Sequence, residues 1–204
     1  KNLSPLNNAP KISSKKIINC TNIVGLAGVE QITEAINTKA DIIICGRSTD
    51  ASLIASLPIM NGVDKAVAWH AGKIGECGAF CTTNPKSGVI LISFKKNGFF
   101  IKPVSNNTKV TPYTVSAHMV YENSNPFTLI EPGGRLDVKK AIYKKQKDGS
   151  VYVTGANWVQ DYNYKIKLEG THVVGYQSIS MVLIRDESYV KNINKWSKQV
   201  KNKV

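Results

Sequence analysis

The sequence predicts an α/β fold whose front part holds a partial parallel sheet with helices and whose back part has α+β character. In the front part, a helical pattern precedes a continuous apolar run at 40–45, and a Gly turn then leads into a second helical segment. Helix, buried strand, turn and helix is the order of elements in an α/β layer. In the back part, strand-length runs flank short turns. We therefore expect a hairpin-rich β region and a C-terminal helix behind the α/β segment.

The front part spans residues 1–87. A short strand is expected at 17–19, and the spacing of apolar residues predicts a helix at 29–37. The run at 40–45 is continuously apolar, as in a strand of a parallel sheet that is covered on both faces. Helix-forming residues follow at 51–57.

A further helix is predicted over 64–81, and it contains several glycines. Glycine inside a helix costs about 1 kcal/mol relative to alanine. These glycines therefore predict the close approach of another backbone or of a ligand.

The back part spans residues 88–204. We expect three hairpins, which join 89–94 to 99–101, 141–145 to 151–154, and 164–168 to 172–184. Thr111 and Pro112 predict the start of a helix that continues over 113–122, and a last helix is expected over 187–201. Because only about two βα units are visible, the chain resembles the back half of a larger α/β protein.

Composition limits the class of protein. Of the 204 residues, 42% are hydrophobic, so the chain has enough apolar material for a core. Its apolar runs are far shorter than the roughly 18 residues of a membrane span. We expect a soluble protein with no membrane partner, and the composition excludes disorder, collagen and a coiled coil.

The net charge of +13 comes almost entirely from lysine, because Arg47, Arg135 and Arg185 are the only arginines. Specific reading of phosphates or bases favours arginine. We interpret the lysine groups as solvated faces and expect no specific nucleic-acid partner. Non-specific attraction to nucleic acid or to an anionic surface is the alternative, and salt would weaken it.

The four cysteines form no pattern typical of a secreted disulfide framework. Cys77 and Cys81 share a helix face, but no second Cys or His pair completes a zinc site. We expect buried thiols, a cytoplasmic location and no metal ligands, and the sequence leaves open which cofactor, if any, the protein uses.

The first candidate site is the segment Gly46-Arg47-Ser48-Thr49-Asp50, at the junction between the predicted strand and a helix N-terminus. Free N–H groups and the helix dipole favour an anion there, and Arg47 would pair with a carboxylate or phosphate. An ordinary helix cap, with Arg47 in solvent, is the alternative.

The second candidate comprises His70 and Lys73 on the predicted helix 64–81, with Glu76 beside Lys73. His70 would act as an acid or base, and Lys73 would hold an anion or attack a carbonyl. A packed helix with a hydrogen-bonded histidine and a solvated lysine is the alternative.

Two weaker candidates lie in the back part. His118 and Glu122 are spaced i, i+4 and would supply two metal ligands, or would form a simple hydrogen-bonded pair. His118 is also an alternative to His70 as the acid or base of the site. The loop Glu131-Pro132-Gly133-Gly134-Arg135 carries both charge signs, and Arg135 is a candidate for anion binding. The loop lacks the spacing of a P-loop or of a dinucleotide-binding turn.

Many segments of the chain, in this order, resemble the acyclic terpene utilisation (AtuA-like) family. They are Asn22–Gly25, Gly28–Glu30, Ala40–Asp50, Ala68–Lys73, Glu76–Gly78, Thr111–Pro112, Val115–His118, Tyr121–Asn123, Asn125–Phe127, Glu131–Gly134, Leu136–Asp137, Lys167–Gly170 and Val174–Gln177. The resemblance covers about residues 20–197 and implies the C-terminal half of a longer protein from bacterial terpene catabolism. Terpene acids are processed there as CoA thioesters, so the resemblance implies a setting rather than a reaction.

These inferences give two functional hypotheses. The first is an enzyme, or half of one, that acts on a small organic acid or its CoA thioester. The second is a non-catalytic accessory or ligand-binding subunit. In either case we expect a homo-oligomer or a pairing with a missing N-terminal half.

Overall fold

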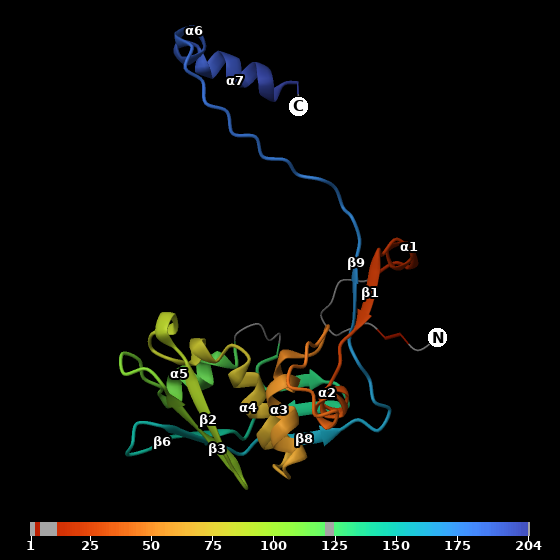
Figure 1. Cartoon of the computed structure of the whole chain (residues 1–204), viewed down its shortest axis with the longest axis vertical. Helices are drawn as coiled ribbons and strands as arrows, with labels where there is room; N and C mark the ends of the chain where they lie inside the picture. The colour runs from red at the N-terminus through yellow and green to blue at the C-terminus, as the bar shows by residue number, and fades with distance from the viewer. Residues whose placement is uncertain (1–2, 5–11, 121–124, 204) are drawn as a thin grey trace. The chain divides into compact units, whose positions relative to one another are not determined.

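The structure is a computed structural model that describes residues 3–4, 12–120 and 125–203 (Figure 1). The helices are α1 (Ser14–Ile18), α2 (Val29–Asn37), α3 (Asp50–Met60), α4 (Lys65–Gly75), α5 (Pro112–His118), α6 (Glu187–Lys191) and α7 (Ile193–Lys201), with short 3-10 turns at Gly78–Cys81 and Pro85–Ser87. The strands are β1 (Asn22–Gly25), β2 (Ile90–Lys95), β3 (Gly98–Pro103), β4 (Thr128–Glu131), β5 (Gly134–Asp137), β6 (Ile142–Lys145), β7 (Val151–Thr154), β8 (Asn157–Gln160) and β9 (Leu168–Thr171).

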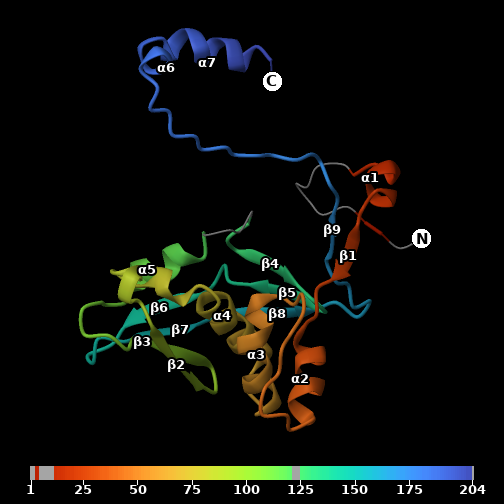
Figure 2. The same cartoon turned by 45° about the horizontal axis from the view of Figure 1, so that its top comes forward.

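These strands form three antiparallel sheets in the described part of the chain. Their orders are β2-β3-β7-β6, β4-β5-β8 and β1-β9 (Figure 2). The mixed α and β class is confirmed, with hairpins and a helical C-terminal end in the back part. The predicted parallel sheet is wrong, because the run at 40–45 forms no strand and leaves Ile42 80% and Ile44 92% exposed. A strand needs a hydrogen-bonded neighbour, and the described residues supply none to this run.

The local predictions had mixed outcomes. The hairpins β2–β3 and β6–β7 and the helices α2 and α3 are confirmed. The expected strand at 17–19 is wrong, since this segment belongs largely to α1, which Ser13 caps. The third hairpin is also wrong, because β9 pairs with β1 and the residues 172–184 form no strand.

The predicted helices differ from the observed ones mainly in length. Helix α4 ends at Gly75 and a 3-10 turn follows, so the segment predicted as one helix over 64–81 is interrupted. Helix α5 begins after its Thr111 cap as predicted, and residues 121 and 122 of its expected end lie outside the described residues. Two helices, α6 and α7, replace the single one predicted over 187–201.

The chain divides into two compact units, one ending at His172 and the other beginning at Val173. The second unit holds α6 and α7, where Tyr189 and Trp196 meet edge to face. In the first unit, α4 contacts strands that follow residue 88, and the domain boundary that we placed at 87/88 stays a prediction. No helix in the described residues is long and apolar enough to cross a membrane.

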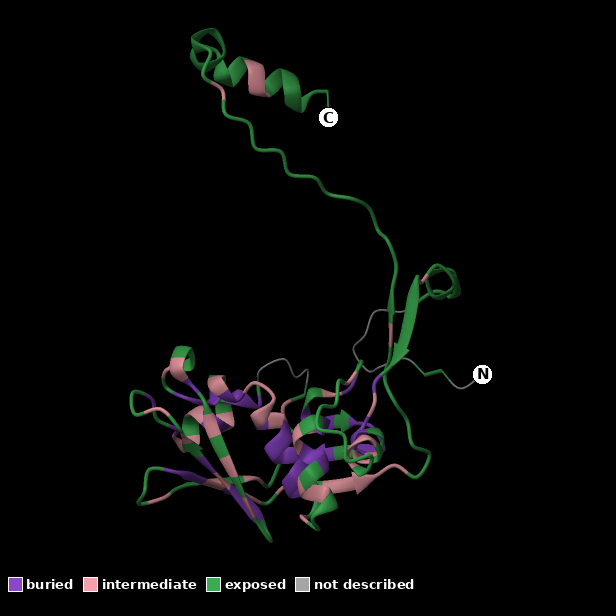
Figure 3. Cartoon of the chain, viewed as in Figure 1, coloured by how far each residue is buried: buried purple, intermediate pink, exposed green. Residues whose placement is uncertain are grey.

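Helix α4 is the centre of the core, as the burial colours of Figure 3 show. It packs against α3 and contacts both the β2–β3 pair and the β5–β8 pair. Trp69 is fully buried on α4 and stacks on Trp158 of β8, with ring centroids 5.3 Å apart and nearly parallel planes. A Cβ atom at Gly72 would lie 2.5 Å from the Ala51 carbonyl oxygen of α3. The predicted close approach of a backbone is therefore confirmed at Gly72.

Gly72→Ala should lower the free energy of unfolding by about 1–3 kcal/mol, because the added methyl group forces α3 and α4 apart. Gly46→Ala is the matched control, since a Cβ atom at Gly46 meets nothing within 4 Å. Urea denaturation of both variants measures the difference. Equal stability of the two variants would contradict the close packing of these helices.

Candidate functional site

A lysine and two glutamates form a largely buried cluster in the first unit. The Lys73 ammonium lies 2.6 Å from Glu76 Oε1 and 3.7 Å from Glu131 Oε1. The side chains of Lys73, Glu76 and Glu131 are 14%, 17% and 5% exposed, respectively. One cation therefore serves two carboxyl groups in an environment that is poor in water.

The local sequence explains how the cluster forms. Lys73 and Glu76 are three residues apart at the end of α4, so their side chains meet on one helix face. Glu131 is the last residue of β4, and the Pro132–Gly133 turn that follows has Gly133 at a φ of +76°. That left-handed backbone favours glycine. The turn ends the strand directly at Glu131.

Burial raises the pKa of Glu131 to about 7, although the Lys73 ammonium opposes this increase. The nearby Thr49 side chain also lowers the pKa, and the Glu76 carboxylate raises it. Neither Thr49 Oγ1 nor Glu131 Oε2 has a hydrogen-bond partner among the described residues. Thr49 is the N-cap residue of α3, so the Glu131 carboxyl lies close to a helix N-terminus. A carboxyl group with a pKa near 7 can both donate and accept a proton at neutral pH.

His118 joins this cluster from the end of α5. Its buried ring has a lowered pKa, mainly because of burial. A hydrogen bond with the Lys73 backbone raises the pKa, and the Lys73 charge lowers it again. His118 is therefore a neutral ring beside Lys73. Glu122, its predicted partner, lies outside the described residues, and no group of three His, Cys, Asp or Glu side chains in the described part of the chain could hold a metal ion.

The segment Gly46–Asp50 divides between two environments. Thr49 faces Glu131, whereas the Arg47 guanidinium donates from Nε to Glu169 Oε2 at 3.0 Å and pairs with it from Nη2 at 2.9 Å. Gly46, Arg47 and buried Ser48 line a small pocket of about 210 Å³. Asp50 is exposed as the first residue of α3. Anion binding at this segment stays a prediction, and Arg47 already has a carboxylate partner.

The other predicted site residues are His70 and Arg135. Among the described residues, neither forms a hydrogen bond or an ion pair with the side chains of Lys73, Glu76 or Glu131. His70 is fully buried, and burial lowers its pKa to about 3. Its Nε2 lies 3.2 Å from the Tyr143 hydroxyl, and its ring meets Phe99 edge to face. Arg135 is exposed on β5. Their predicted roles stay predictions.

Sequence reasoning did not select Glu131 as a site residue, although it noted the loop that begins there. A signal was present in the alternation of side chains along a strand. Leu129 is apolar and two residues before Glu131, so both point to the same face of β4. Leu129 and Glu131 are both buried. A glutamate on the same strand face as an apolar core residue therefore indicated a carboxyl group that points into the protein.

The fold and the site define a mixed α and β protein with a largely buried cluster of titratable side chains at the end of α4 and of β4. Residues 6–204 match the family described as "Acyclic terpene utilisation family protein AtuA", and the chain belongs to this family. The predicted resemblance is confirmed. No curated protein and no solved structure matches the chain.

The raised pKa of Glu131 predicts how stability depends on pH. Between pH 4.5 and about 7 the folded state binds this proton more tightly than the unfolded state. The free energy of unfolding should therefore fall as the pH rises through this interval, by an amount on the order of 1–3 kcal/mol. Glu131→Gln should remove this part of the pH dependence, as measured by urea denaturation at several pH values.

Glu34→Gln is the control for this comparison, because Glu34 is exposed on α2. It should follow the wild-type curve. If Glu131→Gln also runs parallel to the wild type across the interval, Glu131 does not have the raised pKa.

Proposed function

We propose that this protein is an enzyme, or part of one, that transfers a proton on a small organic acid or its CoA thioester. The observation that supports this proposal best is the buried Glu131 carboxyl, with a pKa of about 7, next to the Lys73 ammonium. A general acid or base works best when its pKa lies near the working pH. Buried carboxyl groups with such a pKa concentrate at functional sites.

In this proposal Glu131 is the acid/base. Lys73 supplies positive charge to the oxygen of a substrate carboxylate, carbonyl or thioester, where negative charge develops as a proton leaves the neighbouring carbon. Glu76 holds the Lys73 ammonium at 2.6 Å and so fixes its position. The Thr49 side chain lies near Glu131, and the His118 ring is hydrogen-bonded to the backbone of Lys73.

The class of substrate follows from the family rather than from the geometry. The family name refers to the utilisation of acyclic terpenes, and such compounds are processed as acids and CoA thioesters. We also propose a cytoplasmic location, which the four free cysteines support.

A non-catalytic accessory or ligand-binding role is the second candidate. The low exposure of the cluster favours it, because Glu131 is only 5% exposed and Lys73 only 14%. A buried ion pair can stabilise one conformation of a protein without taking part in a reaction.

The two candidates differ in a turnover experiment. Small acyclic acids and their CoA thioesters are incubated with the protein in D₂O, and NMR follows both product formation and hydrogen exchange next to the carbonyl. The enzyme proposal expects exchange or turnover that falls about a hundredfold or more in Glu131→Gln and Lys73→Met. Glu34→Gln should retain the full rate.

The pH profile and thermal melting complete this test. The rate should change near pH 7, where Glu131 titrates. A compound that raises the melting temperature of the wild type without any exchange or turnover would support the accessory role. Full activity in Glu131→Gln would contradict the assignment of Glu131.

A further inference from the structure

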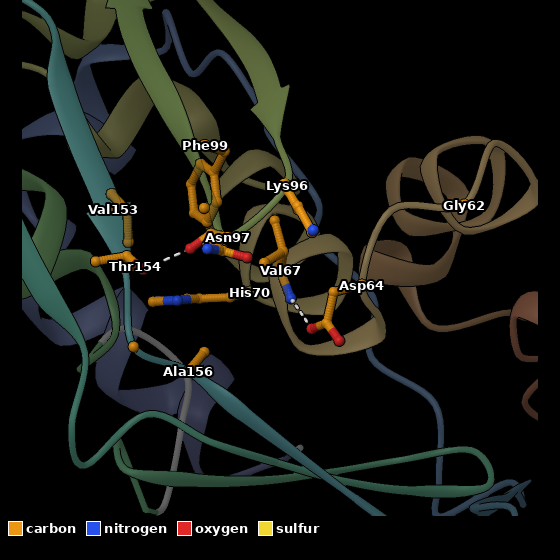
Figure 4. Close-up of a pocket in the computed structure, with 12 residues that line it drawn as sticks. Gly62, Asp64, Val67, His70, Lys96, Asn97, Phe99, Val153, Thr154 and Ala156 are labelled. Atoms are coloured by element: carbon orange, nitrogen blue, oxygen red, sulfur yellow. Dashed lines mark hydrogen bonds between the residues drawn. The ribbon is translucent and has the colours of Figure 1, made fainter.

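A second pocket, of about 520 Å³, lies between α4 and the ends of β3 and β7 (Figure 4). Its volume falls within the range of small-molecule sites, roughly 300–1,000 Å³. The Lys73 cluster is not part of its lining. The pocket is therefore a feature that the proposed acid–base chemistry does not use.

The inner part of this pocket is apolar and aromatic. His70, Phe99 and Val153 line it, and each of them is almost completely buried. The His70 ring is neutral, and its Nδ1 has no hydrogen-bond partner among the described residues. These side chains form an apolar floor beneath the pocket, and the His70 Nδ1 atom is a buried polar atom without a partner in that floor.

The mouth of the pocket carries two opposite charges. Lys96 lies in the turn between β2 and β3, and Asp64 caps α4 by accepting hydrogen bonds from the N–H groups of Ala66 and Val67 at 2.9 and 3.3 Å. Neither Lys96 nor Asp64 forms an ion pair within the described part of the chain. Figure 4 shows both on one side of the pocket, with Val153 and Thr154 on the other side and His70 between them.

We infer that this pocket binds a small zwitterion with an apolar side chain, such as an aromatic α-amino acid. The ligand carboxylate would face the Lys96 ammonium, and the ligand ammonium would face the Asp64 carboxylate. The side chain would lie towards His70 and Phe99. A plain anion would meet the repulsion of Asp64, and a plain cation would meet that of Lys96, so the two opposite charges favour a ligand that carries both.

Three probes of one skeleton separate these possibilities. They are L-phenylalanine, 3-phenylpropanoate, which lacks the ammonium group, and 2-phenylethylamine, which lacks the carboxylate. Isothermal titration calorimetry on the full chain should show binding of phenylalanine. Each analogue should bind about two- to fivefold more weakly, which is the effect of losing one favourable contact with an exposed charge.

Two variants test the residues, and one serves as the control. Lys96→Met and Asp64→Asn should each weaken phenylalanine binding about two- to fivefold. Asn caps a helix as well as Asp, so Asp64→Asn keeps the start of α4 intact. Lys95→Met is the matched control, because Lys95 is an exposed neighbour outside the pocket lining. It should bind phenylalanine like the wild type.

Four outcomes would overturn the inference. They are no binding of phenylalanine up to its solubility limit, binding of 3-phenylpropanoate as tight as that of phenylalanine, an equal loss in Lys95→Met, and unchanged binding in both pocket variants. Thermal melting of each variant shows that a weakened affinity is not a folding defect. Proton transfer at Glu131 is measured separately, so either proposal can fail without the other.

Discussion

The close contact between α3 and α4 is the constraint on which the rest of the first unit depends. Gly72 allows the Ala51 carbonyl to approach α4 more closely than any side chain would permit. This contact fixes the N-terminus of α3 near the last turn of α4. As a result Thr49 and Lys73 reach the same carboxyl group, that of Glu131. A helix made largely of small and apolar residues thus positions the charged groups at its end.

The charged side chains of the cluster lose much of their contact with water. This loss of solvation shifts the pKa of Glu131. Moving a carboxylate out of water costs free energy that one shared ammonium offsets only in part. Glu131 responds by holding its proton up to a pH of about 7. His70, on the same helix, responds to burial in the opposite sense and stays neutral. Helix α4 therefore carries two different environments, one with a titrating acid and one with an uncharged aromatic surface.

Family membership and geometry contribute different information. The family match places the chain among proteins of acyclic terpene utilisation, and it indicates no reacting atom. The geometry indicates a group that can move a proton, and it indicates no substrate. The expectation of a homo-oligomer or of a second half that pairs with this chain stays a prediction.

The sequence alone determined the elements that depend on local interactions. The helices α2 and α3, the Thr111 cap and the hairpins β2–β3 and β6–β7 follow from periodicity, capping residues and short turns, because their partners are near in sequence. Only the tertiary structure decided which distant segments pair, as in β1 with β9 and in the absence of a strand at 40–45. It also decided which candidates meet, since Lys73, Glu131 and Thr49 come from three separate elements. Burial then determined the pKa of Glu131, because the loss of water around a charge depends on the whole fold rather than on neighbours along the chain.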